Sequence, residues 1–336
     1  MSTWLSLAFV GVVLTVVWRF VCPLIRVARL SDRFVLITGC DSGFGRAAAL
    51  RLQARGMKVL AACLTDAGLK SLQADAVRNG PGSLVCVSLD VTKDASVAAA
   101  VETIKKALNG QPLHAIINNA GVLRGGLCDT VPVSDWILQL EVNVLGIARI
   151  TKPLIPLLFA GNGESRIINV ASVAGIFATD GTSAYNASKF AVVGLTDAMR
   201  RELAAWGIQV GMILPGIMKT ELWSQPLSAD SQNKTFASLT ADQKTFYGGP
   251  DYFAKAYDEA RGLVNLVGGN PEKVVDAMEE LSTAKWVATR RYVGHDTWAF
   301  RLLSALPDVI ADKMWASRHI VLRTEPVLPK GVLERK

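Results

Sequence analysis

RFVLITGCDSGFGRAAALRLQARG, residues 33–56, is the stretch that decides the fold of this chain. An apolar, strand-like run is followed by a glycine-rich turn, TGCDSGFG at 38–45, and then by a helical pattern that ends at Gly56. Glycines at such a turn permit a tight bend and let a pyrophosphate approach the N-terminus of the helix. The spacing is G-x-x-x-G-x-G, not the commoner G-x-G-x-x-G, so the turn alone is a weak signal for a nucleotide site.

Strand and helix patterns continue to alternate after Gly56. The later strand-like runs are KVLAAC, SLVCVSL, HAIIN, SRIINVAS and IQVGMIL, with helical patterns between them, the longest at about 134–159. This alternation predicts an α/β fold with a single doubly wound parallel sheet of the Rossmann type. Such a sheet binds ligands beyond the carboxyl ends of its strands.

Polar and turn motifs follow the carboxyl ends of these runs. They are NNAG at 118–121, Asn143 in EVNVLG, Ser172 in NVASVAG, Tyr185 and Lys189 in SAYNASKF, and PGIMKT at 215–220. Tyr185 and Lys189 are four residues apart on a predicted helix and share a face. A free phenol has a pKa of about 10. We expect the nearby cation to lower it, so that the pair exchanges a proton with an alcohol or ketone near pH 7.

Each motif by itself also fits a plain turn, a helix cap or an amphipathic helix. Their order along one chain is what points to a common site. Together they resemble the short-chain dehydrogenase/reductase family over about 32–294. GCDSGFG, LAACLT and RRYVGHD resemble a narrower branch of that family, which contains the retinol, hydroxysteroid and 3-hydroxybutyrate dehydrogenases.

The resemblance implies an enzyme that transfers a hydride between a nicotinamide cofactor and an alcohol or carbonyl. Tyr185 is then the general acid/base, and Lys189 lowers its pKa and binds the nicotinamide ribose. Ser172 hydrogen-bonds the substrate oxygen, and Asn143 holds a water that links Lys189 to solvent.

The resemblance also implies a set of cofactor-binding residues. Its members are Gly39, Asp41, Ser42, Gly43, Phe44, Gly45, Asp90, Val91, Asn118, Ala120, Gly121, Tyr185, Lys189, Pro215, Gly216 and Thr220. The glycine loop would cradle the pyrophosphate, Asp90 the adenine and the PG turn the nicotinamide. We expect NAD rather than NADP, because the second strand ends without a basic residue and Asp41 would repel a 2′-phosphate.

Composition argues against several other classes of protein. Half of the 336 residues are hydrophobic and the net charge is +7, but 1–31 carry +3, 285–336 carry +5 and the middle is −1. We therefore expect no nucleic-acid partner. The five cysteines form no C-x-x-C pair and the three histidines no ligand cluster, so neither a disulfide framework nor a metal site is expected, and the body should face a reducing compartment.

The N-terminal region, 1–30, is expected to be a membrane anchor. Trp4 to Ile25 spans 22 residues, enough to cross a bilayer if Arg19 snorkels. A signal peptide, a mitochondrial presequence and a helix packed on the body are the alternatives. Because the arginines lie on the body side of the segment, we expect an endoplasmic reticulum membrane with the body in the cytosol, and mitochondria as the alternative.

Residues 31–294 are expected to form the dehydrogenase domain, with 217–265 covering the substrate. The aromatic residues there favour a lipophilic secondary or allylic alcohol, such as retinol or a hydroxysteroid, and a role in lipid metabolism. The cations of the same region leave 3-hydroxybutyrate open: Lys219, Lys234, Lys244, Lys255 and Arg261. An inactive cofactor-binding scaffold is the alternative from another class, and the resemblance favours a homo-oligomer.

Residues 295–336 are expected to form a C-terminal extension that is apolar and basic. Its stretch WAFRLLSALPDVIADKMW pairs large apolar residues with Arg301 and Lys313, and Arg318 follows. Such a segment lies on a membrane, covers the mouth of the substrate site, or packs as an ordinary C-terminal helix.

Overall fold

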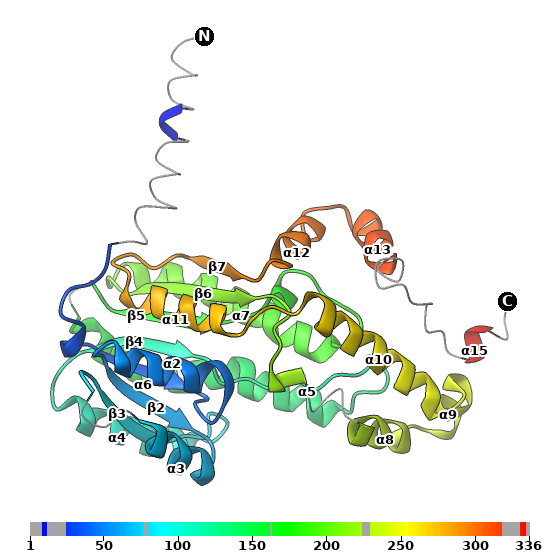
Figure 1. Cartoon of the computed structure of the whole chain (residues 1–336), viewed down its shortest axis with the longest axis horizontal. Helices are drawn as coiled ribbons and strands as arrows, with labels where there is room; N and C mark the ends of the chain where they lie inside the picture. The colour runs from blue at the N-terminus through cyan, green and yellow to red at the C-terminus, as the bar shows by residue number, and fades with distance from the viewer. Residues whose placement is uncertain are drawn as a thin grey trace.

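A seven-stranded parallel sheet forms the centre of the computed structural model (Figure 1). The structure describes residues 9–11, 25–76, 80–161, 163–223, 229–317 and 330–333. The strand order is β3-β2-β1-β4-β5-β6-β7. The strands are β1 Phe34–Thr38, β2 Lys58–Cys63, β3 Ser83–Ser88, β4 Leu113–Asn118, β5 Arg166–Val170, β6 Gln209–Pro215 and β7 Arg290–Val293. The predicted doubly wound α/β fold is therefore confirmed.

Helices cover both faces of the sheet, which explains why its central strands are apolar throughout rather than alternating. Every residue of β1, β4 and β5 is buried. One face is covered by α2 Gly43–Ala54, α3 Asp66–Asp75 and α11 Glu272–Thr283. The other is covered by α4 Asp94–Leu108, α6 Gly146–Phe159 and α7 Ser183–Ala204.

The long helix predicted at about 134–159 is present as a continuous segment from Val133 to Phe159. It consists of α5 Val133–Leu140, a π-helical turn η3 Glu141–Leu145, and α6. Among the described residues, this is the helix whose length and composition would allow it to cross a membrane. Because Ile150, Leu154 and Leu158 are buried against the sheet, it is a core helix here.

A helical lobe lies beyond the carboxyl ends of the strands (Figure 1). It contains η5 Glu221–Trp223, α8 Ala229–Ser238, α9 Ala241–Tyr247 and α10 Pro250–Val267. Its small core is formed by Leu239, Tyr247, Phe253 and Tyr257. The Tyr247 hydroxyl donates to the carboxylate of Asp129, which ties the lobe to the loop after β4.

The remaining elements are short. One of them, η4 Val173–Gly175, follows β5, and the others lie toward the two ends of the chain: η2 Leu30–Asp32, α12 Thr297–Leu303, α13 Asp308–Ala316 and α15 Lys330–Leu333. In Figure 1, α12 and α13 project beyond β7, at the edge of the sheet. The predicted anchor lies mostly outside the described residues. Of its described part, residues 9–11 are helical with exposed side chains.

The last residues of the predicted anchor region, 25–30, are bound to the end of α11. Val27 N–H donates to the Thr283 carbonyl at 2.8 Å, and Lys285 N–H donates to the Ile25 carbonyl at 2.7 Å. The Arg26 side chain donates to the Glu280 carbonyl and to the Thr283 hydroxyl. The start of the described body is thus held against the C-terminus of one helix.

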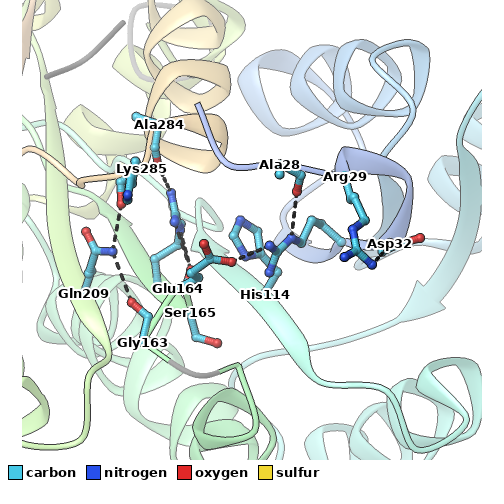
Figure 2. A network of polar contacts seen from close by, with 12 residues as sticks. Ala28, Arg29, Asp32, His114, Gly163, Glu164, Ser165, Gln209, Ala284 and Lys285 are labelled. Carbon is cyan, nitrogen blue, oxygen red and sulfur yellow. Dashed lines mark hydrogen bonds and ion pairs between the residues drawn. The ribbon is translucent and has the colours of Figure 1, made fainter. Parts of the chain in front are cut away.

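A fully buried arginine, Arg166, also binds this helix end. Its guanidinium donates to the carbonyls of Leu281, Ala284 and Glu164. His114 bonds the Ser282 carbonyl at 3.0 Å. Figure 2 shows His114, Glu164 and Ala284 in this network of polar contacts. The last carbonyls of a helix lack partners and carry partial negative charge, so a cation there is stabilising. Burial lowers the pKa of Arg166 to about 10 and that of His114 to about 3, so at neutral pH the arginine is charged and the histidine neutral.

We predict that Arg166→Leu lowers the free energy of unfolding by about 3 kcal/mol, because it leaves several buried carbonyls without a donor. The stability of Arg166→Lys should fall between those of the parent and of Arg166→Leu, since an ammonium reaches fewer of these carbonyls. Arg55→Leu, at an exposed ion pair with Glu279, should cost less than about 1 kcal/mol and is the control. Urea unfolding of the detergent-solubilised chain measures all three. A Leu variant as stable as the parent would remove the capping role.

Candidate active site

A cavity of about 950 Å³ opens at the carboxyl ends of the strands. It is near the upper limit for small-molecule sites. Most of the predicted site residues line it: Gly39, Asp41, Ser42, Gly43, Phe44, Asp90, Val91, Ala120, Gly121, Ser172, Tyr185, Lys189, Pro215, Gly216 and Thr220. Gly45, Asn118 and Asn143 are not among the lining residues.

The glycine loop between β1 and α2 is held by close backbone packing. Gly39 and Gly43 have positive φ of 71° and 58°. A Cβ on Gly39 would lie 2.8 Å from the Ala120 Cα, and one on Gly45 would lie 2.3 Å from the Gly39 carbonyl oxygen. Gly45 therefore permits the tight fold of the loop rather than facing the cavity. The first amides of α2 are left for a ligand, which fits a pyrophosphate at this helix N-terminus.

Asn119, which is absent from the predicted set, fixes this loop to the turn after β4. Its side-chain amide donates to the carbonyls of Thr38 and Gly39 at 2.9 and 3.1 Å. The Thr38 hydroxyl in turn accepts from the backbone amides of Asn119 and Ala120. The neighbouring Asn118 is buried instead and donates to Asn169 and Thr151. The sequence could have indicated that Asn118 and Asn119 have different roles, because successive side chains of a strand point to opposite faces.

Asp41 reaches from the glycine loop to the end of β2. Its carboxylate accepts from the Leu64 amide at 2.8 Å, the Thr65 amide at 2.9 Å and the Thr65 hydroxyl at 2.8 Å. The Thr65 hydroxyl also caps α3 by accepting from Gly68 N–H. The end of β2 thus receives a negative charge from another loop, although β2 carries no acid of its own.

Arg46, the cation that follows the glycine loop on α2, is paired with α3. Arg46 donates to the Asp75 carboxylate at 2.6 Å and to the Ser71 hydroxyl at 3.0 Å, both on α3. Asp90 lines the cavity, and its carboxylate is oriented by the amide and hydroxyl of Thr92. The described surroundings at the end of β2 are therefore acidic and polar rather than basic.

Tyr185, Lys189 and Ser172 meet on the cavity wall. Tyr185 and Lys189 lie one turn apart on α7, 7% and 6% exposed, with the Lys189 Nζ 5.6 Å from the centre of the Tyr185 ring. Lys189 donates to the Val170 carbonyl at 3.0 Å. The Ser172 hydroxyl accepts from Ala174 N–H and lies 3.5 Å from the Pro215 carbonyl. This arrangement can present a phenol and a second hydroxyl to one bound oxygen.

Burial, rather than the neighbouring cation, governs the protonation of this pair. It raises the pKa of Tyr185 to about 12, with the Ser172 hydroxyl opposing the shift, and lowers that of Lys189 to about 8. The prediction that Lys189 brings the phenol near neutrality is therefore wrong for the protein without ligands. At pH 7 Tyr185 is a neutral phenol and Lys189 is mostly an ammonium.

Asn143 lies behind the wall in the π-helical turn η3 and is 1% exposed. Its side chain bonds both backbone groups of Val122, at 2.8 and 3.0 Å, and the Ser188 hydroxyl at 2.9 Å. It thus connects the segment after β4 to α7. The water-holding role predicted for Asn143 stays a prediction.

The turn after β6 is held by residues from the C-terminal part of the chain. Gly216 N–H donates to the Val293 carbonyl at 2.8 Å, and Ile217 N–H donates to the Asp296 carboxylate at 2.7 Å. Asp296 was also absent from the predicted site residues. Its only sequence signal was its place in the motif RRYVGHD.

The far end of the cavity is mostly apolar and aromatic. Its lining includes Leu123, Leu127, Tyr252, Phe253, Tyr257, Leu263, Val264, Phe300 and Trp315. Phe300 and Trp315 pack with Phe177, and the Trp315 indole donates to Asp180 at 2.9 Å. Residues of both 217–265 and the C-terminal extension thus line the cavity.

Few cations line this cavity among the residues that the structure describes. They are Lys189 and Arg124. The five cations considered as a carboxylate clamp, Lys219, Lys234, Lys244, Lys255 and Arg261, are not among the lining residues.

Comparisons with known proteins agree with this site. The model of the family "short chain dehydrogenase" matches residues 33–231. Rat retinol dehydrogenase 7 is 36% identical over 296 residues, 87% of this chain and 90% of that protein. Human 17-beta-hydroxysteroid dehydrogenase type 6 is 35% identical over 313 residues, 92% and 95% of the two chains.

Solved structures show the same fold. Levodione reductase has a TM-score of 0.64 at 24% identity, covering 81% of this chain and 99% of its own. A Brucella melitensis 3-ketoacyl-(acyl-carrier-protein) reductase in complex with NADH has a TM-score of 0.62 at 26% identity, covering 79% and 98%. With the motifs and the sheet in agreement, this chain belongs to the short-chain dehydrogenase family and is an oxidoreductase of its retinol and hydroxysteroid dehydrogenase branch.

Proposed function

We propose that this enzyme transfers a hydride between NAD(H) and a lipophilic secondary or allylic alcohol or its carbonyl, of the retinol or hydroxysteroid type. The observation that carries the proposal is the cavity, whose aromatic end leads to Tyr185, Ser172 and Lys189. The names of the rat and human relatives support the same class of substrate. Apolar cavities with a few converging polar groups suit such ligands.

The nicotinamide would supply or accept the hydride when bound. In reduction, the Tyr185 hydroxyl gives its proton to the substrate oxygen while Ser172 donates a hydrogen bond to that oxygen. In oxidation, the Tyr185 oxygen takes the proton back. Because burial keeps Tyr185 protonated at pH 7, the free protein is set for carbonyl reduction, and alcohol oxidation should accelerate as the pH rises.

The glycine loop and the end of β2 suit NAD. Gly39, Ser42 and Gly43 would hold the pyrophosphate, and Asp90 and Val91 the adenine. The carboxylate of Asp41 lies at the end of β2, where it suits a ribose hydroxyl better than a 2′-phosphate. Lys189 would bind the second ribose, and the turn at 215–220 would meet the nicotinamide.

A lipophilic substrate fits the cavity better than 3-hydroxybutyrate does. Much of the lining of the cavity is apolar and aromatic, which suits a lipophilic ligand better than a four-carbon acid. The cations that could have bound its carboxylate do not line the site, apart from Lys189 and Arg124 in the part that the structure describes.

The outer side of α12 and α13 favours a membrane surface. Large apolar side chains are exposed there: Trp298, Leu302, Val309, Ile310 and Met314. The inner side of the same helices lines the cavity through Phe300 and Trp315. We propose that this surface and the N-terminal segment hold the body at the endoplasmic reticulum membrane, on its cytosolic side, so that the substrate enters from the bilayer. The homo-oligomer expected from the resemblance stays a prediction.

We predict that Lys189→Met raises stability at pH 7 while it weakens cofactor binding. Burial lowers the pKa of Lys189 from 10.5 to about 8, so the unfolded chain binds more protons between these values. The penalty is full below pH 8 and is relieved as the pH rises toward 10.5, which amounts to roughly 3 kcal/mol at pH 7. The free energy of unfolding of the Met variant should therefore exceed that of the parent by a large amount at pH 7 and by a small amount at pH 10.

Unfolding midpoints at the two pH values check this. Lys70→Met, on the exposed side of α3, is the control and should change little at either pH. A Lys189→Met variant that is less stable than the parent at pH 7 would contradict the desolvation argument.

Tyr185→Phe should abolish turnover and leave cofactor binding nearly intact, because the ring still fills its site and only the proton carrier is lost. General acid/base catalysis is worth roughly 10²–10⁴-fold. Residual activity above about one part in a hundred of the parent would exclude this role. NADH binding, followed by fluorescence, shows whether the site is intact.

Retinol and a 17-hydroxysteroid should exceed 3-hydroxybutyrate in kcat/KM by on the order of a hundredfold, since each buried CH₂ contributes about 0.8 kcal/mol. Liposomes should raise activity with the two lipophilic alcohols only. The double change Val309→Ser and Ile310→Ser should reduce this stimulation, and Val133→Ser, exposed on α5, should not. A preference for 3-hydroxybutyrate would reject the lipophilic substrate.

A further inference from the structure

Asp296 places a buried carboxylate against the turn that follows β6. It ends the motif RRYVGHD, lies directly before α12 and is 8% exposed. Its Oδ2 accepts from the Ile217 amide at 2.7 Å. Next to this contact, β7 accepts from the Gly216 amide through the Val293 carbonyl. The turn is thus fixed at two successive amides by a segment far along the chain.

Two glycines leave the space that this carboxylate occupies. A Cβ on Gly216 would lie 2.0 Å from the Asp296 Oδ1, and one on Gly294 would lie 2.5 Å from the same atom. Gly294 also has a positive φ of 120°. Since any other residue at 216 or 294 would displace the carboxylate, the chain is built to admit Asp296 at this point.

The carboxylate is costly to keep there, which argues against a role in packing alone. Burial raises its pKa, opposed by the backbone amides of Ile217, Asp296 and Thr297 and by the exposed His295. Its Oδ1 is buried and has no hydrogen-bond partner within the described residues. A buried polar atom without a partner costs about 1–3 kcal/mol. An apolar side chain would fill the space without this cost.

The turn that Asp296 holds faces the cavity beside the catalytic residues. Pro215, Gly216, Ile217, Met218 and Thr220 all line it. The Pro215 carbonyl lies 3.5 Å from the Ser172 hydroxyl. Asp296 also precedes α12, whose Phe300 lines the cavity. One side chain therefore connects the wall near the reacting atoms to the helices that cover the site.

We propose that Asp296 is a positioning residue for the cofactor: its carboxylate fixes the Ile217 amide, and with it the turn 215–220, to the start of α12. The proposal rests on the proposed function in one respect, that this turn meets the nicotinamide. Without the carboxylate the turn loses its anchor at Ile217, and the cofactor must order it on binding.

The test compares Asp296→Ala with Asp296→Asn in the full chain in detergent. The first readout is amide hydrogen exchange of the peptide that contains Ile217, without cofactor. The second is the Kd for NADH and for NADPH. In the Ala variant we expect exchange at Ile217 to rise and NADH to bind about tenfold more weakly, the effect of one lost hydrogen bond to a charged group. Asn keeps an acceptor oxygen and should restore both.

Asp312→Ala, on the exposed side of α13, is the matched control and should change neither readout. Unchanged exchange at Ile217 or an unchanged Kd in Asp296→Ala overturns the proposal. Exchange that rises equally in α4, far from the turn, also overturns it, because the residue would then be needed for the fold in general. A parent chain that binds neither NADH nor NADPH rejects the proposed function instead, and exchange at Ile217 still decides whether the contact exists.

Discussion

The contact between the turn after β1 and the turn after β4 is the interaction on which the rest of the site depends. These two strands are neighbours where the order of the sheet changes direction, so their turns diverge and leave a crevice. Asn119 and the Thr38 hydroxyl join the turns by hydrogen bonds, and Gly39 approaches Ala120 too closely for a side chain. The glycine loop therefore faces the crevice, and the first backbone amides of α2 point toward the crevice.

Buried ionisable groups have opposite effects at the two ends of the sheet. At the amino end, Arg166 binds the carbonyls that end α11, so its charge is matched and the helix is stabilised. At the carboxyl end, Lys189 has one carbonyl partner and Asp296 has an oxygen without a partner in the described structure. The buried charges beside the cavity therefore destabilise the fold, whereas contacts remote from the cavity, such as those of Arg166, stabilise it.

Local patterns were enough to predict the strands β1 to β6, the glycine loop and the Tyr185–Lys189 helix, because each depends on residues close in sequence, but β7 was not among the predicted strands. Contacts between distant segments could not be read in this way. Asp41 acts at the end of β2 through Leu64 and Thr65, so a search for an acid on β2 itself finds nothing. Asp296 meets Ile217 only because β7 pairs with β6.

The prediction that Lys189 lowers the pKa of Tyr185 toward neutrality failed for a related reason. Spacing on a helix shows that a cation is near, but not how much water is removed from the phenol. The lysines and the arginine of 217–265 show the same limit. Composition placed them in the region that covers the site, and only the fold shows that they do not line it.

The space shared by Gly216, Gly294 and Asp296 restricts how this chain can evolve. A mutation that adds a side chain at either glycine collides with the carboxylate, and the loss of the carboxylate leaves a void beneath a turn that has no other bond to Ile217 N–H. A larger residue at 216 is therefore expected only in chains that also lack the acid at 296. The loss of Asp296 alone sets no such condition, because it removes the clash at Gly216 and leaves Gly294 required by its positive φ of 120°.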